Sequence, residues 1–136
     1  MKLAIYFLTV FSLIFFGCAA NEQDAIKADS VFENATYKNM TVDELNQQLK
    51  NKDFVLVDVH IPEQNHINGT DAFIPYDEIE NQLDKLPQDK DAKIVLYCRT
   101  GRMSEIAAQK LAEKGYSNVY NVVGGMVEWV KRGYDK

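Results

Sequence analysis

The sequence has 136 residues and a formal net charge of −5, so it suits a single domain and does not favour nucleic acid as a partner. Its apolar fraction of 46% is ordinary for a globular protein. Arginine is rare: only three are present, and two of them, Arg99 and Arg102, lie close to Cys98. This local cationic spot on an acidic protein points to a small anionic ligand, because guanidinium groups bind anions directly.

The N-terminus predicts an export signal. Lys2 supplies a positive charge, and the apolar run from Leu3 to Phe16 is shorter than the roughly 20 residues of a membrane-spanning helix. The run ends in Gly17-Cys18, which resembles the cleavage site of bacterial lipoprotein signals. The resemblance implies a signal peptide at 1–17, a lipidated Cys18 and a protein tethered to a membrane of the cell envelope. The alternative is an uncleaved anchor with an incidental cysteine.

The segment after this signal is polar and lacks sustained periodicity, so residues 18–37 are predicted to be a flexible linker. Residues 38–136 remain for one domain, and roughly 100 residues are enough for a single hydrophobic core. If Cys18 carries lipid, Cys98 is the only thiol left, and no intramolecular disulfide is possible.

Helical and strand patterns alternate along the rest of the chain. Thr41 and Glu44 form a capping box, which predicts a helix that continues to about Lys50. Continuous apolar runs predict strands that are buried on both faces. The expected strands are 54–57, 72–74, 94–97 and 119–122, and the further expected helices are 77–86, 104–114 and 126–131. The alternation predicts an α/β fold, with an open parallel sheet flanked by helices on both faces.

The residues that carry chemistry lie between the strand 94–97 and the helix after it, where open α/β sheets bind ligands. Free backbone N–H groups at a helix N-terminus stabilise an anion. We therefore expect the thiolate of Cys98 to be stabilised, which makes this residue a candidate nucleophile. Arg99 and Arg102 add charge for an incoming anion, and Gly101 allows a tight turn.

The stretch YCRTGRMSEIAAQKLAEKGYSNVYNVVGGMVEW, with FVLVDV and IPYDEI before it, resembles the rhodanese-like domain family over about residues 38–133. The resemblance implies a sulfurtransferase. Cys98 would take sulfane sulfur from a donor such as thiosulfate as a persulfide and pass it to a thiol or cyanide. It also implies a donor-binding loop made of Arg99, Thr100, Gly101, Arg102 and Met103, with Asp58 and Ser104 supporting the site. No cofactor and no metal are expected, because His60 and His66 without a paired cysteine are weak metal evidence.

Two departures from the family pattern bear on the function. The sixth loop position, often arginine in the family, is Met103, and the arginine stands fifth at Arg102. Phosphatases of similar fold resemble a loop that is one residue longer with arginine seventh, where this chain has Ser104. A phosphatase is therefore disfavoured. The remaining alternative is a non-enzymatic persulfide carrier that docks to a partner at the membrane.

Overall fold

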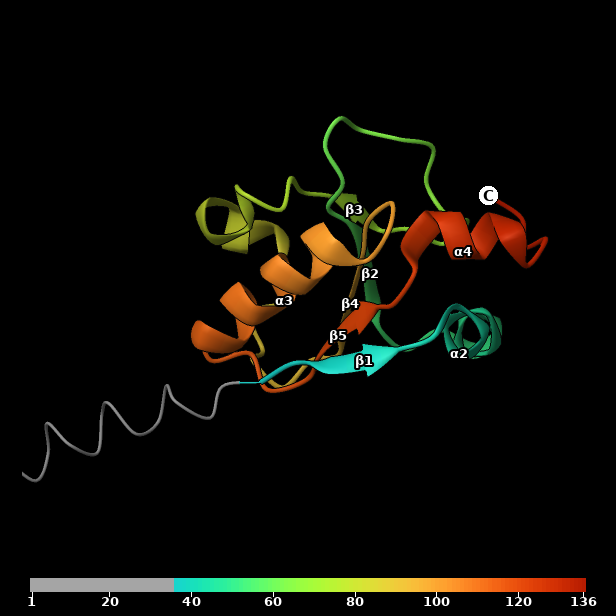
Figure 1. The fold of residues 1–136 in the computed structure, drawn as a ribbon. Coiled ribbons are helices and arrows are strands. Elements are labelled where there is room, and N and C mark those ends of the chain that lie inside the picture. Colours follow the sequence, from blue (N-terminus) through green and yellow to red (C-terminus); the bar gives the residue numbers. More distant parts are fainter. Residues whose placement is uncertain (1–35) are drawn as a thin grey trace, which may run out of the picture.

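A five-stranded sheet organises the chain in the computed structural model, which describes residues 36–136 (Figure 1). The strand order is β1-β5-β4-β2-β3, and all neighbouring strands are parallel. The strands are β1 (Lys38–Met40), β2 (Val55–Asp58), β3 (Ala72–Phe73), β4 (Ile94–Tyr97) and β5 (Val119–Val122). The predicted open parallel α/β sheet is confirmed.

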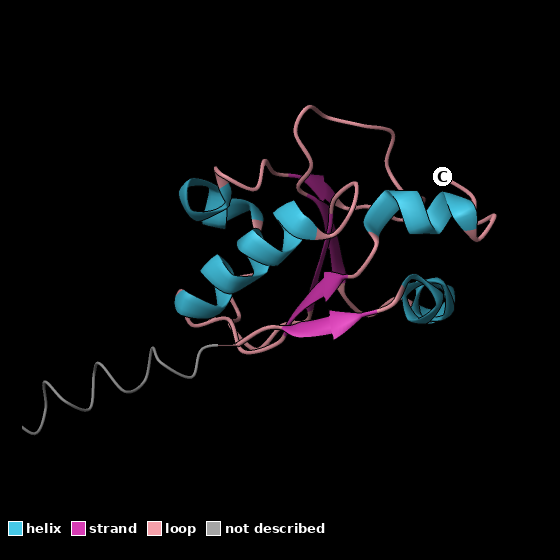
Figure 2. Cartoon of the chain, viewed as in Figure 1, coloured by secondary structure: helices cyan, strands magenta, loops and turns pink. Residues whose placement is uncertain are grey.

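Helices cover both faces of the sheet, with η2 and α3 on one side and α2 and α4 on the other (Figure 2). The helical elements are α2 (Val42–Gln48), η1 (Leu49–Asn51), η2 (Ile79–Lys85), α3 (Arg102–Glu113) and α4 (Gly125–Lys131). Side chains of β4 alternate between the two cores. Leu96 belongs to the core beneath α3, and Tyr97 belongs to the core that includes residues of α2 and α4.

The predicted capping box starts α2. Thr41 Oγ1 accepts a hydrogen bond from the Glu44 backbone N–H at 3.2 Å, and Glu44 accepts one from the Thr41 backbone N–H at 2.7 Å. These two bonds satisfy N–H groups that a helix start leaves free.

Two predicted helices differ most from the structure, and one strand had not been predicted. The segment expected as an α-helix at 77–86 forms the 3₁₀ element η2, with non-helical dihedral angles at Gln82. The apolar spacing that indicated an α-helix also fits turns of three residues, in which residues i and i+3 share a face. The helix expected from Ser104 begins two residues earlier, because Gly101 caps it in a left-handed conformation. Strand β1 was not expected.

The predicted signal peptide, Cys18 and all but the last two residues of the predicted linker lie outside the described residues. Between residues 36 and 136, no helix is long and apolar enough to cross a membrane.

Candidate functional site

Cys98 directly follows β4 and is almost completely buried, with 1% of its surface exposed. The Gly101 backbone N–H donates a hydrogen bond to its Sγ at 3.1 Å. Gly101 has a φ of +98°, and a Cβ atom there would lie 3.1 Å from the Gly124 nitrogen and 3.3 Å from the Val122 oxygen. Glycine is therefore required at this position for the chain to turn and direct an N–H at the sulfur.

The start of α4 packs directly against the outer side of the loop. The backbone N–H groups of Met126 and Val127 donate to the carbonyl oxygens of Cys98 and Arg99, each at 2.9 Å. Gly125, with a φ of +52°, permits this approach, since a Cβ atom there would lie 2.3 Å from the Cys98 oxygen. Gly125 was not predicted as a site residue, and its only signal in the sequence is the Gly-Gly pair before a helix.

Ser104 and Asn121 form a buried polar pair next to the thiol. Ser104 Oγ lies 3.5 Å from Cys98 Sγ and 2.6 Å from Asn121 Oδ1. Ser104 is 0% and Asn121 is 4% exposed. Ser104 was predicted to support the site, and the structure brings it to the sulfur. Asn121 was missed, and its only signal was an amide within an otherwise apolar strand.

Both predicted arginines lie on the loop, and both are exposed. Neither forms an ion pair with another residue in the range 36–136, so both charges are available to an anion. Arg102 lines a small polar pocket that also contains Asn39, Thr100 and Glu105, but not Cys98. Met103 is partly buried and packs against the core beneath α3 rather than standing free in the loop.

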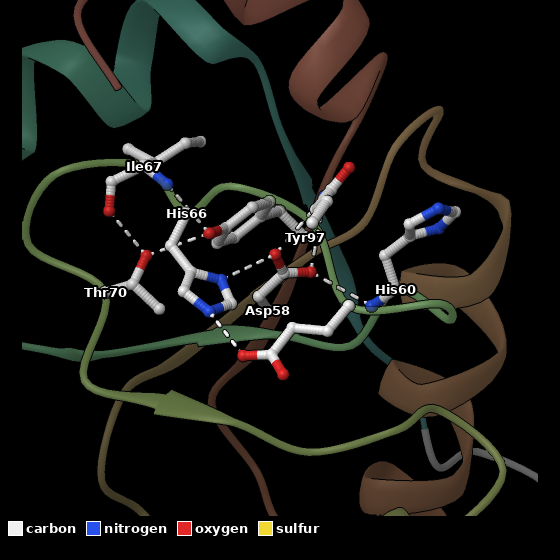
Figure 3. Close-up of polar contacts among 8 residues, drawn as sticks. Asp58, His60, His66, Ile67, Thr70 and Tyr97 are labelled. Carbon is white, nitrogen blue, oxygen red and sulfur yellow. Dashed lines mark hydrogen bonds and ion pairs between the residues drawn. The ribbon is translucent and has the colours of Figure 1, made fainter.

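Asp58 ends β2 and is fully buried, and Figure 3 shows the contacts of its carboxylate. It accepts hydrogen bonds from the His60 backbone N–H at 3.0 Å and the Gln64 amide at 3.2 Å, and its Oδ2 lies 2.9 Å from His66 Nδ1. The other ring nitrogen of His66 lies 3.0 Å from Glu63. Asp58 therefore fixes the connection between β2 and β3, residues 60–71. Its predicted role in supporting the thiol site stays a prediction.

The two histidines have different surroundings. Burial lowers the pKa of His66, but the hydrogen bonds to Asp58 and Glu63 outweigh it, and the net shift raises the pKa. The His60 side chain points away from Asp58 in Figure 3, and its buried Nδ1 has no hydrogen-bond partner among the described residues. Within residues 36–136, no group of three or more His, Cys, Asp or Glu is placed to hold a metal ion.

Tyr97 fixes the far end of the same connection. Its hydroxyl accepts a hydrogen bond from the Ile67 backbone N–H at 3.0 Å and contacts Thr70 Oγ1 at 2.9 Å (Figure 3). Burial raises the pKa of Tyr97, and the nearby Asp58 carboxylate adds to that effect. The phenol therefore stays neutral, and it serves as a hydrogen-bonding anchor rather than as a base.

The structure is an open parallel α/β sheet with a cysteine at the carboxyl end of a central strand and a tight turn that leads into a helix. Domains of this class bind ligands at the carboxyl ends of their strands, and a helix N-terminus there favours an anion. The family model of the rhodanese-like domain matches residues 41–132 of the chain. The chain therefore belongs to the rhodanese-like domain family, as its sequence resemblance implied.

Individual relatives agree with this assignment. The chain is 35% identical over 99 residues to the tRNA uridine(34) hydroxylase of Erwinia tasmaniensis, covering 68% of this chain and 28% of that relative. It thus spans less than a third of that relative's length. The crystal structure of a rhodanese-like domain protein from Staphylococcus aureus superposes with a TM-score of 0.60 at 30% identity, covering 68% of this chain and 90% of that one. An NAD-dependent persulfide reductase from A. fulgidus superposes with a TM-score of 0.57 at 29% identity, covering 79% of this chain but 18% of that one.

Proposed function

We propose that this protein is a sulfurtransferase that carries sulfane sulfur as a persulfide on Cys98. The supporting observation is the contact of the Gly101 N–H with Cys98 Sγ, at the start of α3. A backbone donor and a helix N-terminus both favour negative charge on the sulfur, and the thiolate is the nucleophilic form. The two unpaired arginines of the loop supply positive charge for an anionic donor.

The reaction has two covalent steps. The Cys98 thiolate attacks the outer sulfur of thiosulfate, the S–S bond of the donor breaks, and sulfite leaves with the bonding electron pair. Cys98 then carries a persulfide whose terminal sulfur is negatively charged. An acceptor thiolate or cyanide attacks that terminal sulfur, and the Cys98 thiolate leaves. Both steps are nucleophilic displacements, so no external oxidant or reductant is needed.

Names of relatives support different parts of the proposal. A persulfide reductase contains a domain of this fold at 29% identity, which is consistent with persulfide chemistry. Several relatives are named tRNA uridine(34) hydroxylase, but this chain matches only 28% to 34% of their length. These relatives therefore support only the domain assignment, and hydroxylation is not proposed for this chain.

The test is mass spectrometry of the purified full chain after exposure to thiosulfate. Cys98 is expected to gain about 32 Da per sulfur atom, and cyanide or a thiol is expected to remove it. Cys98→Ser should abolish loading and turnover without unfolding the protein, because the two side chains differ little in size. A Cys98→Ser protein that transfers sulfur at the wild-type rate would contradict the proposal. Loading without turnover would instead identify a carrier.

We further propose that the mature protein begins at a lipidated Cys18 and is held on a membrane of the cell envelope. Several acyl chains would anchor it firmly, at about 0.8 kcal/mol for each buried methylene. Cys18→Ser should release the protein from the membrane fraction or stall its processing. Wild-type protein that keeps Met1 and an unmodified Cys18 would rule out this processing.

A further inference from the structure

We infer that Asn121 is a positioning residue of the Cys98 site, acting through the hydroxyl group of Ser104. The inference rests on the proposed function only in taking Cys98 as the reactive thiol. Asn121 lies in β5 and Ser104 lies in the first turn of α3, so two separate elements bring the pair together. Both side chains are buried, so water has little access to the contact between them.

Ser104 Oγ has three acceptors within reach and only one proton to donate. It lies 2.6 Å from Asn121 Oδ1, 3.1 Å from the Gly101 carbonyl oxygen and 3.5 Å from Cys98 Sγ. The bond to Asn121 is the shortest and falls in the normal range for a hydroxyl donor. In the structure, the hydroxyl proton is therefore directed at Asn121 rather than at the sulfur.

The orientation of the Asn121 amide is fixed from its other side. Asn39 and Asn121 are opposite one another in the parallel pair of β1 and β5. Asn121 Nδ2 donates to Asn39 Oδ1 at 3.3 Å, so its oxygen is the atom left to face Ser104. A hydrogen-bonded series thus runs from Asn39, in the edge strand β1, through Asn121 to Ser104, whose Oγ lies 3.5 Å from the Cys98 sulfur.

Asn121 consequently competes with the sulfur for one proton. A neutral thiol is a weak acceptor, so the Ser104 hydroxyl remains with Asn121. When Cys98 loses its proton, the hydroxyl can stabilise the thiolate only by leaving Asn121. By holding the hydroxyl, Asn121 thus withholds one hydrogen-bond donor from the sulfur, while the Gly101 N–H supplies another. Removing the acceptor should therefore favour the thiolate.

The test follows the rate of Cys98 alkylation by iodoacetamide as a function of pH. The full chain carries Cys18→Ser, so that Cys98 is its only thiol. Asn121→Leu removes the acceptor, and the midpoint of the profile should move to lower pH by roughly 0.5 to 1 unit, the equivalent of one ordinary hydrogen bond. Asn121→Asp nearly preserves the shape but holds the hydroxyl more strongly and adds negative charge, so its midpoint should move to higher pH.

The control separates positioning from packing. In a Ser104→Ala background, Asn121→Leu should cause no further shift, because the hydroxyl through which it acts is gone. Equal shifts with and without Ser104, or shifts of the same sign for Asn121→Leu and Asn121→Asp, would overturn the inference. If Asn121→Leu fails to fold, Asn121→Asp decides, and an unchanged or lower midpoint overturns it. Alkylation needs no sulfur donor, so failure of sulfur transfer would contradict the proposed function without affecting this result.

Discussion

Gly125 is the first residue of α4, and it packs against the loop that carries Cys98. Its φ of +52° lies in the left-handed region, and the space for its missing Cβ is filled by the Cys98 and Arg99 backbone. The Met126 N–H bond to the Cys98 oxygen depends on that close approach. A side chain at this position would both strain the backbone and separate α4 from the loop.

Gly125→Ala and Gly115→Ala distinguish these two effects. Gly115 also has a positive φ, +90°, but no atom lies within 4 Å of a Cβ placed there. Gly115→Ala should lower the free energy of unfolding by about 1–2 kcal/mol through backbone strain alone. Gly125→Ala should lower it more than twice as far and slow sulfur loading. Urea denaturation measures the first quantity, and equal losses in the two variants would show that the contact is unimportant.

Some site residues were predictable from the sequence and others were not. Cys98, Gly101 and Ser104 fall in one short segment whose composition indicates a helix-start anion site. Asn121 lies in β5, and the pairing of β5 with β4 brings it to Ser104 beside the thiol. A single sequence carries no information on that pairing, so the contact had to be found in the structure.

The connection from His60 to Asp71 joins β2 to β3. It is attached at one end to Asp58 and at the other to the Tyr97 hydroxyl. Asp58 and Tyr97 are paired in the register of β2 and β4, so one pair of neighbouring residues in the sheet holds both ends of the connection. Sequence patterns indicated only a loop here, because its anchors belong to strands before and after it.

The contact between His66 and the two carboxylates predicts a pH dependence of stability. The pKa of His66 is raised in the folded state, so protonation favours folding. This contribution is complete below the unfolded value of about 6.5 and is lost as pH rises through the folded value. The stability difference between wild type and His66→Asn should therefore shrink as the pH rises from about 6 to 9, measured by urea denaturation at each pH.

His60→Asn provides the matched control for that series. It removes the other histidine of the same connection, which forms no ion pair with any residue of the described chain. His60→Asn leaves the contacts of His66 with Asp58 and Glu63 in place, so it shows the pH response of stability when those contacts are retained. A difference for His66→Asn that stays constant or grows with pH would show that its protonation does not stabilise the fold.

The prediction of strands and helices succeeded where the hydrophobic pattern was continuous. β2 and β4 are buried runs of branched apolar residues, and they form the centre of the sheet. β1 has only one buried residue, Met40, and it exists because the edge of β5 offers free backbone groups. Its three residues carry no periodicity that a sequence reading could detect.

Charge is unevenly distributed over the whole molecule. The sequence is acidic overall, with a net charge of −5, but two of its three arginines lie on the loop and form no ion pair among residues 36–136. The third, Arg132, is paired with Asp43 at 2.6 Å and Glu128 at 3.0 Å, away from the loop. An anionic donor is thus repelled by the molecule as a whole and attracted by the loop at short range.

The overall repulsion and the local attraction together predict how salt changes kcat/KM for thiosulfate. In the Arg99→Ala/Arg102→Ala double variant, kcat/KM for thiosulfate at low salt should fall roughly three- to tenfold, from the loss of two nearby charges. For the wild type, added salt should lower kcat/KM, because it screens the local attraction. For the double variant, which keeps only the repulsion, salt should raise it.

Arg132→Ala is the control, since it removes the same charge from an ion pair distant from the thiol. It should leave both kcat/KM and its salt dependence close to the wild-type values, at temperatures where the variant stays folded. The reversal of sign in the double variant is the decisive result, because general destabilisation would lower the rate without changing the direction of the salt effect. A double variant that responds to salt as the wild type does would show that Arg99 and Arg102 do not attract the donor.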